Sequence, residues 1–230
     1  MSAWRARAAI VARDWAHVGV RWPAAVMDRT QADAWASGDR IPVVLLPGIW
    51  EPWRYLRPLG ERLHHAGHPV FPVPALRLNG ADLAASAEVV AAFLAARDLR
   101  NVVLVAHSKG GLIGKQAMLR PEVAARVRGM VAVCSPFDGS RLARPVFART
   151  PLGLFCPDGG VLLALAAERA VNARITSIGA AWDEMIPDGS VLPGARNITV
   201  AMPGHFLPIA DPGVATLVCA EVDRFVKGDR

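Results

Sequence analysis

The segment VVLVAHSKGGLIGKQA, residues 102–117, is the feature of this sequence that most limits how the chain can fold. A continuous apolar run, typical of a strand buried on both faces, leads into His107 and Ser108, and a helix is expected over residues 109–119. A strand that passes into a helix at one serine needs a very tight turn. Small residues two before and two after the serine are a steric requirement of such a turn, and Ala106 and Gly110 provide them.

Strands and helices alternate along the chain from Ile41 onward. The strand segments are IPVVLL, HPVFPV, NVVLVA, GMVAVC, ITSIGA and NITVAM, and helices are expected at 54–66, 82–96, 109–119, 161–170 and from Pro212. This alternation predicts a parallel sheet with right-handed crossovers. We therefore expect a three-layer α/β domain over 39–230, with about six mostly parallel strands flanked by helices. HPVFPV, with two prolines, belongs near the sheet edge.

Ser108 is predicted to be a nucleophile, and the alternative is a serine that only caps the following helix. A serine hydroxyl needs a base to take its proton. His205 follows the last strand in AMPGHF, and the carboxyl ends of parallel strands are where active sites gather. His107 adjoins the serine, but neighbouring side chains in a strand point to opposite faces. We therefore predict His205 as the general base.

An acid is needed to orient the histidine, and Asp183 follows the strand ITSIGA in AAWDEMIP. Glu184 and Asp188 are its rivals, and Asp188 lies in the turn sequence PDGS. The chain order Ser108, Asp183, His205 is the one expected when a serine elbow lies on a parallel sheet. Asp183 is the predicted acid.

Two backbone N–H groups are expected to stabilise a negatively charged oxygen beside Ser108. Lys109, directly after the serine at the helix N-terminus, provides one. The loop LPGIW after the first strand is expected to provide the other, because Gly48 allows close approach. Ile49 is the predicted donor, and the geometry of the loop decides between Ile49 and Trp50.

Four segments resemble the α/β-hydrolase family, and more narrowly the minimal bacterial lipases and esterases of the small Bacillus type: VVLLPGIW, VVLVAHSKGGLIGK, CSPFDGS, and ITSIGAAWDEMIP with GARNITVAMPGH. Those enzymes similarly have alanine at the first position of the elbow and an acid a little over twenty residues before the histidine. The likeness covers roughly residues 41–227. It implies a six-stranded core without the first two strands of the fold, and hydrolysis of carboxylic esters through an acyl-enzyme.

Two positions depart from that pattern. Pro47 stands where many relatives have histidine, so the oxyanion loop is expected to differ in shape. Lys109 replaces an apolar residue after the serine, and its charge is expected to shift the pH profile or favour acidic substrates.

The substrate pocket is expected to be apolar, for an ester with an apolar acyl group. The aromatic residues beside the catalytic segments are candidates for its lining or for the core: Trp50, Trp53, Phe137, Trp182 and Phe206. The only insertion large enough to form a cap is 141–160, whose three prolines favour a fixed loop. The apolar VLLALAA after it is a further candidate for the pocket wall.

Residues 1–38 form a separate helical extension in this interpretation, with Trp4, Trp15 and Trp22 on one face and arginines between them. The helix either packs on the domain or makes weak contact with a membrane surface through residues 1–22. Pro23 is expected to end or redirect it.

Composition excludes several other classes. The net charge of +6 comes from scattered arginines without a basic run, so nucleic-acid binding is not expected. The three cysteines show no metal-ligand or disulfide spacing, so we expect neither a metal site nor a cofactor. No signal peptide or transmembrane run is seen, which favours a cytoplasmic protein.

The sequence therefore predicts a serine esterase or lipase. A thioesterase or amidase using the same three residues remains an alternative. A non-catalytic binding or membrane-surface module of the same fold is another.

Overall fold

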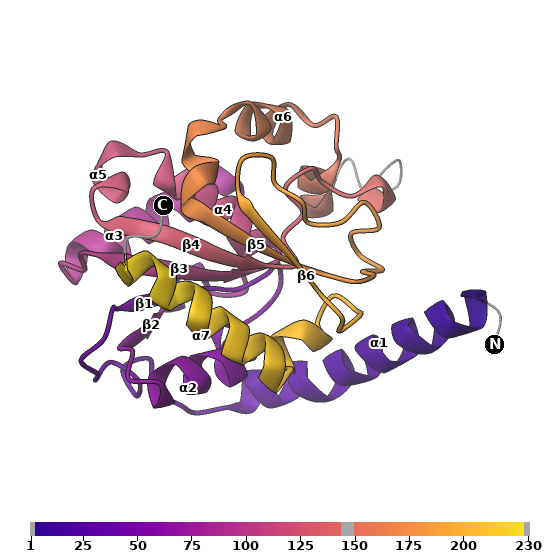
Figure 1. The fold of residues 1–230 in the computed structure, drawn as a ribbon, viewed down its shortest axis with the longest axis horizontal. Coiled ribbons are helices and arrows are strands. Elements are labelled where there is room, and N and C mark those ends of the chain that lie inside the picture. The colour runs from indigo at the N-terminus through magenta and orange to yellow at the C-terminus, as the bar shows by residue number, and fades with distance from the viewer. Residues whose placement is uncertain (1–2, 144–149, 228–230) are drawn as a thin grey trace.

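Six parallel strands form one twisted sheet in the order β2–β1–β3–β4–β5–β6 (Figure 1). The computed structural model describes residues 3–143 and 150–227. The strands are β1 Val43–Leu46, β2 Val70–Pro72, β3 Val102–His107, β4 Val127–Val133, β5 Ile175–Ala180 and β6 Arg196–Val200. All six predicted strand segments are present. The segment with two prolines forms β2, a three-residue strand at one edge of the sheet, where missing N–H donors are tolerated.

The helices of the described chain cover both faces of this sheet (Figure 1). They are α1 Ala3–Met27, α2 Arg57–His65, α3 Leu83–Ala96, α4 Lys109–Met118, α5 Pro121–Ala124, α6 Gly160–Ala167 and α7 Pro212–Lys227. This arrangement confirms the predicted three-layer α/β fold.

Strand alternation creates two separate cores. Val44 and Leu46 of β1 pack in the cluster that includes α3, α4 and α6. Val43 and Leu45 point the other way, into the cluster that includes α2 and α7. Because β1 is buried on both faces, its sequence is apolar at every position.

Two predicted helix starts are confirmed by their caps. The Asp82 carboxylate accepts the N–H of Ala85 at 2.7 Å at the start of α3. The Asp211 carboxylate accepts the N–H of Val214 at 2.9 Å, with Pro212 in the first helical position of α7. Each carboxylate satisfies an N–H group that has no partner within its own helix.

Helix α1 continues through Pro23, so the expectation that this proline ends or redirects the helix was wrong. The four residues beyond Pro23 carry Ala25 into the core beside α2 and α7, where it is buried. Asp28, just after the helix, pairs with Arg57 at 2.9 Å. These tertiary contacts offset the hydrogen bond that the proline cannot donate.

The N-terminal half of α1 extends beyond the rest of the ribbon (Figure 1). Trp4 is 67% exposed there, while Asp14, further along the helix, is completely buried. The extension therefore packs on the domain through its middle and its C-terminal end. In the described part of the chain, no helix has the length and apolar character needed to cross a membrane.

Candidate active site

Ser108 lies between β3 and α4 in a backbone conformation that is strained for a non-glycine residue, with φ 51° and ψ −122°. The chain turns so sharply that a Cβ atom on Gly110 would lie 2.2 Å from the carbonyl oxygen of Leu46. A side chain at that position is therefore excluded by the backbone of β1. This tight turn presents the serine at the carboxyl edge of the sheet, as the sequence predicts.

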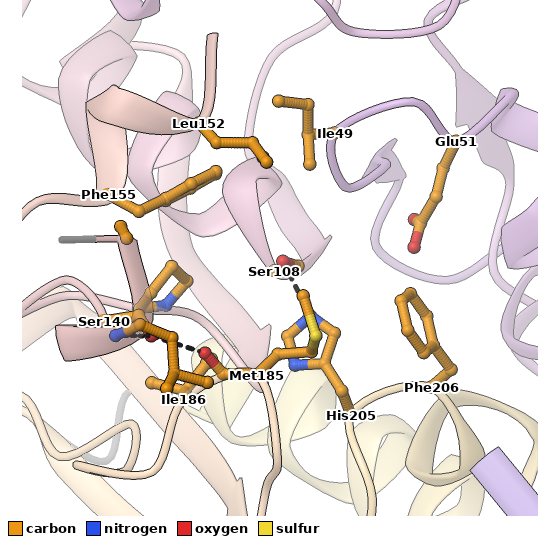
Figure 2. Close-up of a pocket in the computed structure, with 13 residues that line it drawn as sticks. Ile49, Glu51, Ser108, Ser140, Leu152, Phe155, Met185, Ile186, His205 and Phe206 are labelled. Atoms are coloured by element: carbon orange, nitrogen blue, oxygen red, sulfur yellow. Dashed lines mark hydrogen bonds between the residues drawn. The ribbon is translucent and has the colours of Figure 1, made fainter. Parts of the chain in front are cut away.

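Three side chains that are distant in sequence form a hydrogen-bonded chain at this edge. The hydroxyl of Ser108 lies 2.9 Å from Nε2 of His205, and Nδ1 of His205 lies 2.8 Å from the carboxylate of Asp183 (Figure 2 shows the first of these contacts). All three residues are buried. With Asp183 accepting the Nδ1 proton, Nε2 carries the lone pair that faces the serine.

Asp183 is held in its ionised form by the loop that carries it. Its second oxygen accepts the N–H groups of Met185 at 2.8 Å and Ile186 at 2.9 Å. Burial opposes ionisation, but the interactions with His205 and these two N–H groups hold the pKa of Asp183 below its usual value. Asp183 is thus positioned as an anion that can stabilise a charged histidine ring.

The rival acids lie elsewhere. Asp188 is paired with Arg141 at 2.7 Å. Glu184 lies near Asp14 of α1, and burial, then the interaction with Asp14, raises its pKa to about 8. Of the three candidates, only Asp183 is hydrogen-bonded to His205 in the described structure.

His107 is part of a second buried pair directly behind the serine. Its Nδ1 lies 2.9 Å from the carboxylate of Glu51, and its Nε2 lies 3.0 Å from the carbonyl oxygen of His205. Both partners are acceptors, so both ring nitrogens donate. Burial disfavours the charged ring, but the Glu51 carboxylate and the His205 carbonyl raise the pKa of His107. Neither ring nitrogen of His107 is bonded to Ser108, in agreement with the prediction that His107 does not serve as the base.

Glu51 also shapes the loop after β1. Its carboxylate accepts the N–H of Gly48 at 2.7 Å, and the N–H of Glu51 is bonded to the carbonyl of Gly48. The N–H of Gly48 is therefore occupied. Ile49 lines the pocket that contains Ser108, whereas Trp50 adopts φ 58° and is half exposed. Within the described structure, the N–H groups of Ile49 and Lys109 donate to no protein acceptor.

A cavity of about 120 Å³ opens beside Ser108 and His205. Its walls are mainly apolar, and Figure 2 shows several of them around the serine. They come from the loops after β1, β4, β5 and β6 and from the described parts of the predicted cap: Ile49, Pro136, Leu142, Ala143, Leu152, Phe155, Met185, Ile186 and Phe206. Residues 144–149 of the predicted cap lie outside the described residues. Its described parts include two short 3-10 helices, Arg141–Ala143 and Pro151–Phe155.

Four of the five aromatic residues predicted for the pocket are placed elsewhere. Trp53 and Phe137 are buried in the two cores. Trp50 turns toward solvent, and Trp182 contacts Arg7 of α1 at 5.6 Å. Only Phe206 of this group lines the described cavity, because closeness in sequence to a catalytic segment does not set the direction of a side chain.

The structure places the charge of Lys109 away from the cavity lining, which argues against the expected preference for acidic substrates, while the expected shift of the pH profile stays a prediction. The buried ammonium of Lys109 donates to the carbonyl oxygens of Asn79, at 2.8 Å, and Ala81. Burial, partly offset by Asp82, lowers the pKa of Lys109 to about 8. Lys109 is not among the residues that line the cavity, and the carboxylate that does line it is Glu51.

Sequence reasoning missed Glu51 and Asp14, although both carry a signal. Asp14 is the only acidic residue of α1. A single carboxylate on a helix rich in arginine and tryptophan is unusual and points to a specific partner. Glu51 lies in the loop after β1, but nothing local indicates that it would contact His107 at the end of the neighbouring strand β3.

A parallel sheet with a strained serine between β3 and α4 defines the α/β-hydrolase class of fold. Comparison with protein families agrees, because the profile described as "Alpha/beta hydrolase family" matches residues 43–229. The chain belongs to this family, and membership supports a hydrolase activity. A search of curated proteins gave no significant match.

Solved structures with the same fold include several hydrolases. Aspergillus fumigatus lipase B has a TM-score of 0.70 at 18% identity, covering 86% of this chain but only 55% of the fungal chain. Bacillus licheniformis lipase BlEst2 in its mature form has a TM-score of 0.64 at 15% identity, covering 80% and 96% of the two chains. A Pseudomonas putida deformylase that acts on N-formylmaleamic acid has a TM-score of 0.61 at 18% identity, covering 80% and 93%. At these identities the likeness shows the fold.

Proposed function

We propose that this protein is a serine hydrolase that cleaves carboxylic esters through an acyl-enzyme. The observation that carries the proposal is the continuous hydrogen-bonded chain from Ser108 through His205 to Asp183, at the mouth of an apolar cavity. Asp183 has a lowered pKa, and each member has the hydrogen-bonded neighbour that nucleophilic catalysis needs.

In the first step the Ser108 oxygen attacks the ester carbonyl while its proton moves to Nε2 of His205. The ring becomes positively charged, and Asp183 stabilises it without taking the proton. His205 then gives that proton to the leaving alcohol as the carbon–oxygen bond breaks. Water, activated by the same nitrogen, attacks the acyl-enzyme and releases the acid and the free serine.

The negative oxygen formed in both attacks is assigned to the N–H groups of Ile49 and Lys109. Gly48 has its own N–H occupied by Glu51, and Ile49 lines the cavity beside the serine. Lys109 is the first residue of α4, so its N–H lies at the positive end of the helix dipole.

The acyl group is assigned to the apolar cavity. Its 120 Å³ are comparable to a cavity that holds benzene, about 150 Å³, so acyl groups of about four to six carbons fit best.

Labelling with a fluorophosphonate probe tests the proposal, with wild type beside Ser108→Ala. We expect labelling of the wild type and none of the variant, together with hydrolysis of p-nitrophenyl butyrate that follows the same pattern. A folded wild-type protein that is not labelled, or a Ser108→Ala variant that hydrolyses the ester at the wild-type rate, would overturn it.

Thioesters and amides are alternatives for the same three residues, and the deformylase with the same fold gives the amide alternative a specific basis. Matched butanoyl substrates with oxygen, sulfur and nitrogen leaving groups distinguish them. We expect the oxygen ester to give the highest kcat/KM.

A second role, weak contact with an anionic lipid surface, is favoured by the exposed tryptophans of α1. Trp4, Trp15 and Trp22 are spaced by 11 and 7 residues, close to three and two helical turns, and each is at least 36% exposed. The net charge of +6 matches an anionic membrane. Flotation with phosphatidylserine vesicles should carry wild type and release Trp4→Ala, with Leu163→Ala on α6 as an exposed control. No flotation of wild type would remove this role.

A further inference from the structure

A carboxylate of the N-terminal helix reaches the loop that carries the predicted general base. Asp14 is completely buried (0% exposed). Its two carboxylate oxygens accept the N–H groups of three consecutive residues. The distances are 3.0 Å from His205, 3.1 Å from Phe206 and 2.8 Å from Leu207. The carboxyl group of Glu184, from the loop that carries Asp183, also interacts with Asp14.

The contact has the chemistry of a helix cap supplied from outside. A 3-10 helix begins at Leu207, and Phe206 before it has no side chain that can cap the free N–H groups. Successive N–H groups at such a start form a concave site for an anion. Asp14 fills that site although it lies 191 residues before His205 in the sequence, and the amides compensate for burial of its charge.

The backbone before His205 is built closely around this carboxylate. Gly204 has φ +102°, and a Cβ atom placed on it would lie 2.5 Å from an oxygen of Asp14. The N–H of Gly204 donates to the carbonyl of Trp182 at 2.8 Å, which ties the same turn to the loop carrying Asp183. The turn before His205 is therefore packed directly against Asp14 and bonded to the loop that carries Asp183.

Other contacts of α1 reach the remaining catalytic loops. Nε1 of Trp22 donates to the carbonyl of Trp50 at 2.7 Å, in the loop predicted to bind the oxyanion. The ring of Trp15 meets Phe206 edge to face at 5.9 Å, and Arg7 lies over Trp182 at 5.6 Å. The helix thus contacts the loops after β1, β5 and β6, although it precedes the residues matched by the family profile.

We propose that Asp14 is a positioning residue, through which α1 holds His205 in line with Ser108 and Asp183. His205 is held on both sides of its backbone, with Asp14 on its N–H and His107 on its carbonyl oxygen. The inference rests on the proposed function, because it assigns Asp14 a role in that same hydrolysis.

The test compares Asp14→Ala and Asp14→Asn with wild type, using p-nitrophenyl butyrate and the fluorophosphonate probe. We expect kcat to fall about 10- to 100-fold in Asp14→Ala with KM within about twofold, since a small misplacement of a catalytic group costs this much. The labelling rate should fall by the same factor. Asp14→Asn keeps one acceptor oxygen, so a smaller loss in the same direction is expected, and it supplies a second variant if Asp14→Ala does not fold.

Asp28→Ala is the matched control. Asp28 anchors the far end of α1 through Arg57 and the N–H of Thr30, at 2.9 and 2.8 Å, without touching a catalytic loop. It should lower the melting temperature but leave kcat unchanged. If folded Asp14 variants keep the kcat of Asp28→Ala, the positioning role is overturned while the hydrolase function stands. If wild type shows no activity that depends on Ser108, the proposed function fails, and this inference fails with it.

Discussion

Three buried carboxylates, Asp14, Glu51 and Asp183, surround the histidine loop, and each is satisfied in a different way. Asp14 accepts three backbone N–H groups and also interacts with the carboxyl group of Glu184. Asp183 accepts two N–H groups and a histidine ring, and Glu51 accepts one N–H group and the ring of His107. A buried charge is tolerated only with such partners. At the residue scale, the site is therefore a set of anions matched to specific donors.

Glu51 is expected to stabilise the fold as well as the site. Glu51→Gln should lower the free energy of unfolding by about 3 kcal/mol, because it removes one partner of a buried ion pair. Chemical denaturation measures this loss. Glu61→Gln is the control, since its pair with Arg57 is exposed and should contribute less than about 1 kcal/mol. Equal stability of the two variants would contradict the role assigned to the Glu51–His107 pair.

Glu184 is expected to make the folded protein less stable as the pH rises above neutral. Its pKa rises from 4.5 to about 8 in the folded protein, first through burial. A group with a raised folded pKa stabilises the protein below its unfolded pKa, and that stability is lost as pH rises toward 8. Glu184→Gln should therefore raise the melting temperature at pH 9 and change it little at pH 4.5. The same gain at both pH values would contradict this.

At the scale of elements, the turn between β3 and α4 is determined by local sequence, whereas the end of helix α1 is determined by tertiary packing. The turn is dictated locally, because only small residues fit beside Ser108. Helix α1 contradicts its local signal at Pro23 and continues because its C-terminal turn is packed on the domain. Tertiary contacts therefore decide where this helix ends.

Pro23→Ala is expected to stabilise the protein. A proline inside a helix destabilises the folded protein by about 3 kcal/mol. Replacing it raises the conformational entropy of the unfolded chain, which favours unfolding by up to about 1 kcal/mol. The net gain should be at least about 1 kcal/mol in denaturant unfolding, with kcat unchanged. A loss of stability would mean that the proline ring itself contributes to packing.

At the scale of the molecule, the parallel sheet brings residues from position 14 to position 206 to one edge. The described parts of the cap, including Leu152 and Phe155, line one side of the cavity there (Figure 2). Chain-length preference is therefore a property of how the cap lies over the sheet.

Leu152→Ala is expected to shift the preference toward longer acyl chains. Each buried methylene contributes about 0.8 kcal/mol, close to fourfold in kcat/KM. The ratio of kcat/KM for p-nitrophenyl octanoate over butyrate should rise several-fold. Leu163→Ala, exposed on α6, should leave the ratio unchanged. An unchanged ratio in Leu152→Ala would place the acyl group elsewhere.

The sequence by itself determined the sheet, its edge strand, the serine turn and the order of the three predicted catalytic residues. Strand periodicity, caps and the small residues around Ser108 are local properties, and parallel strands bring their carboxyl ends together whatever the details of the loops. The resemblance to α/β hydrolases added the expected activity, and the family is confirmed.

Only the tertiary structure decided which side chains line the cavity and which carboxylates hold the loops. Trp53 and Phe137 lie in the core because the direction of a loop residue depends on packing across elements. The contacts Asp14–His205 and Glu51–His107 join segments 191 and 56 residues apart, and no local pattern encodes such pairs. Their physical basis is the need of a buried charge for a partner, which the chain meets only when folded.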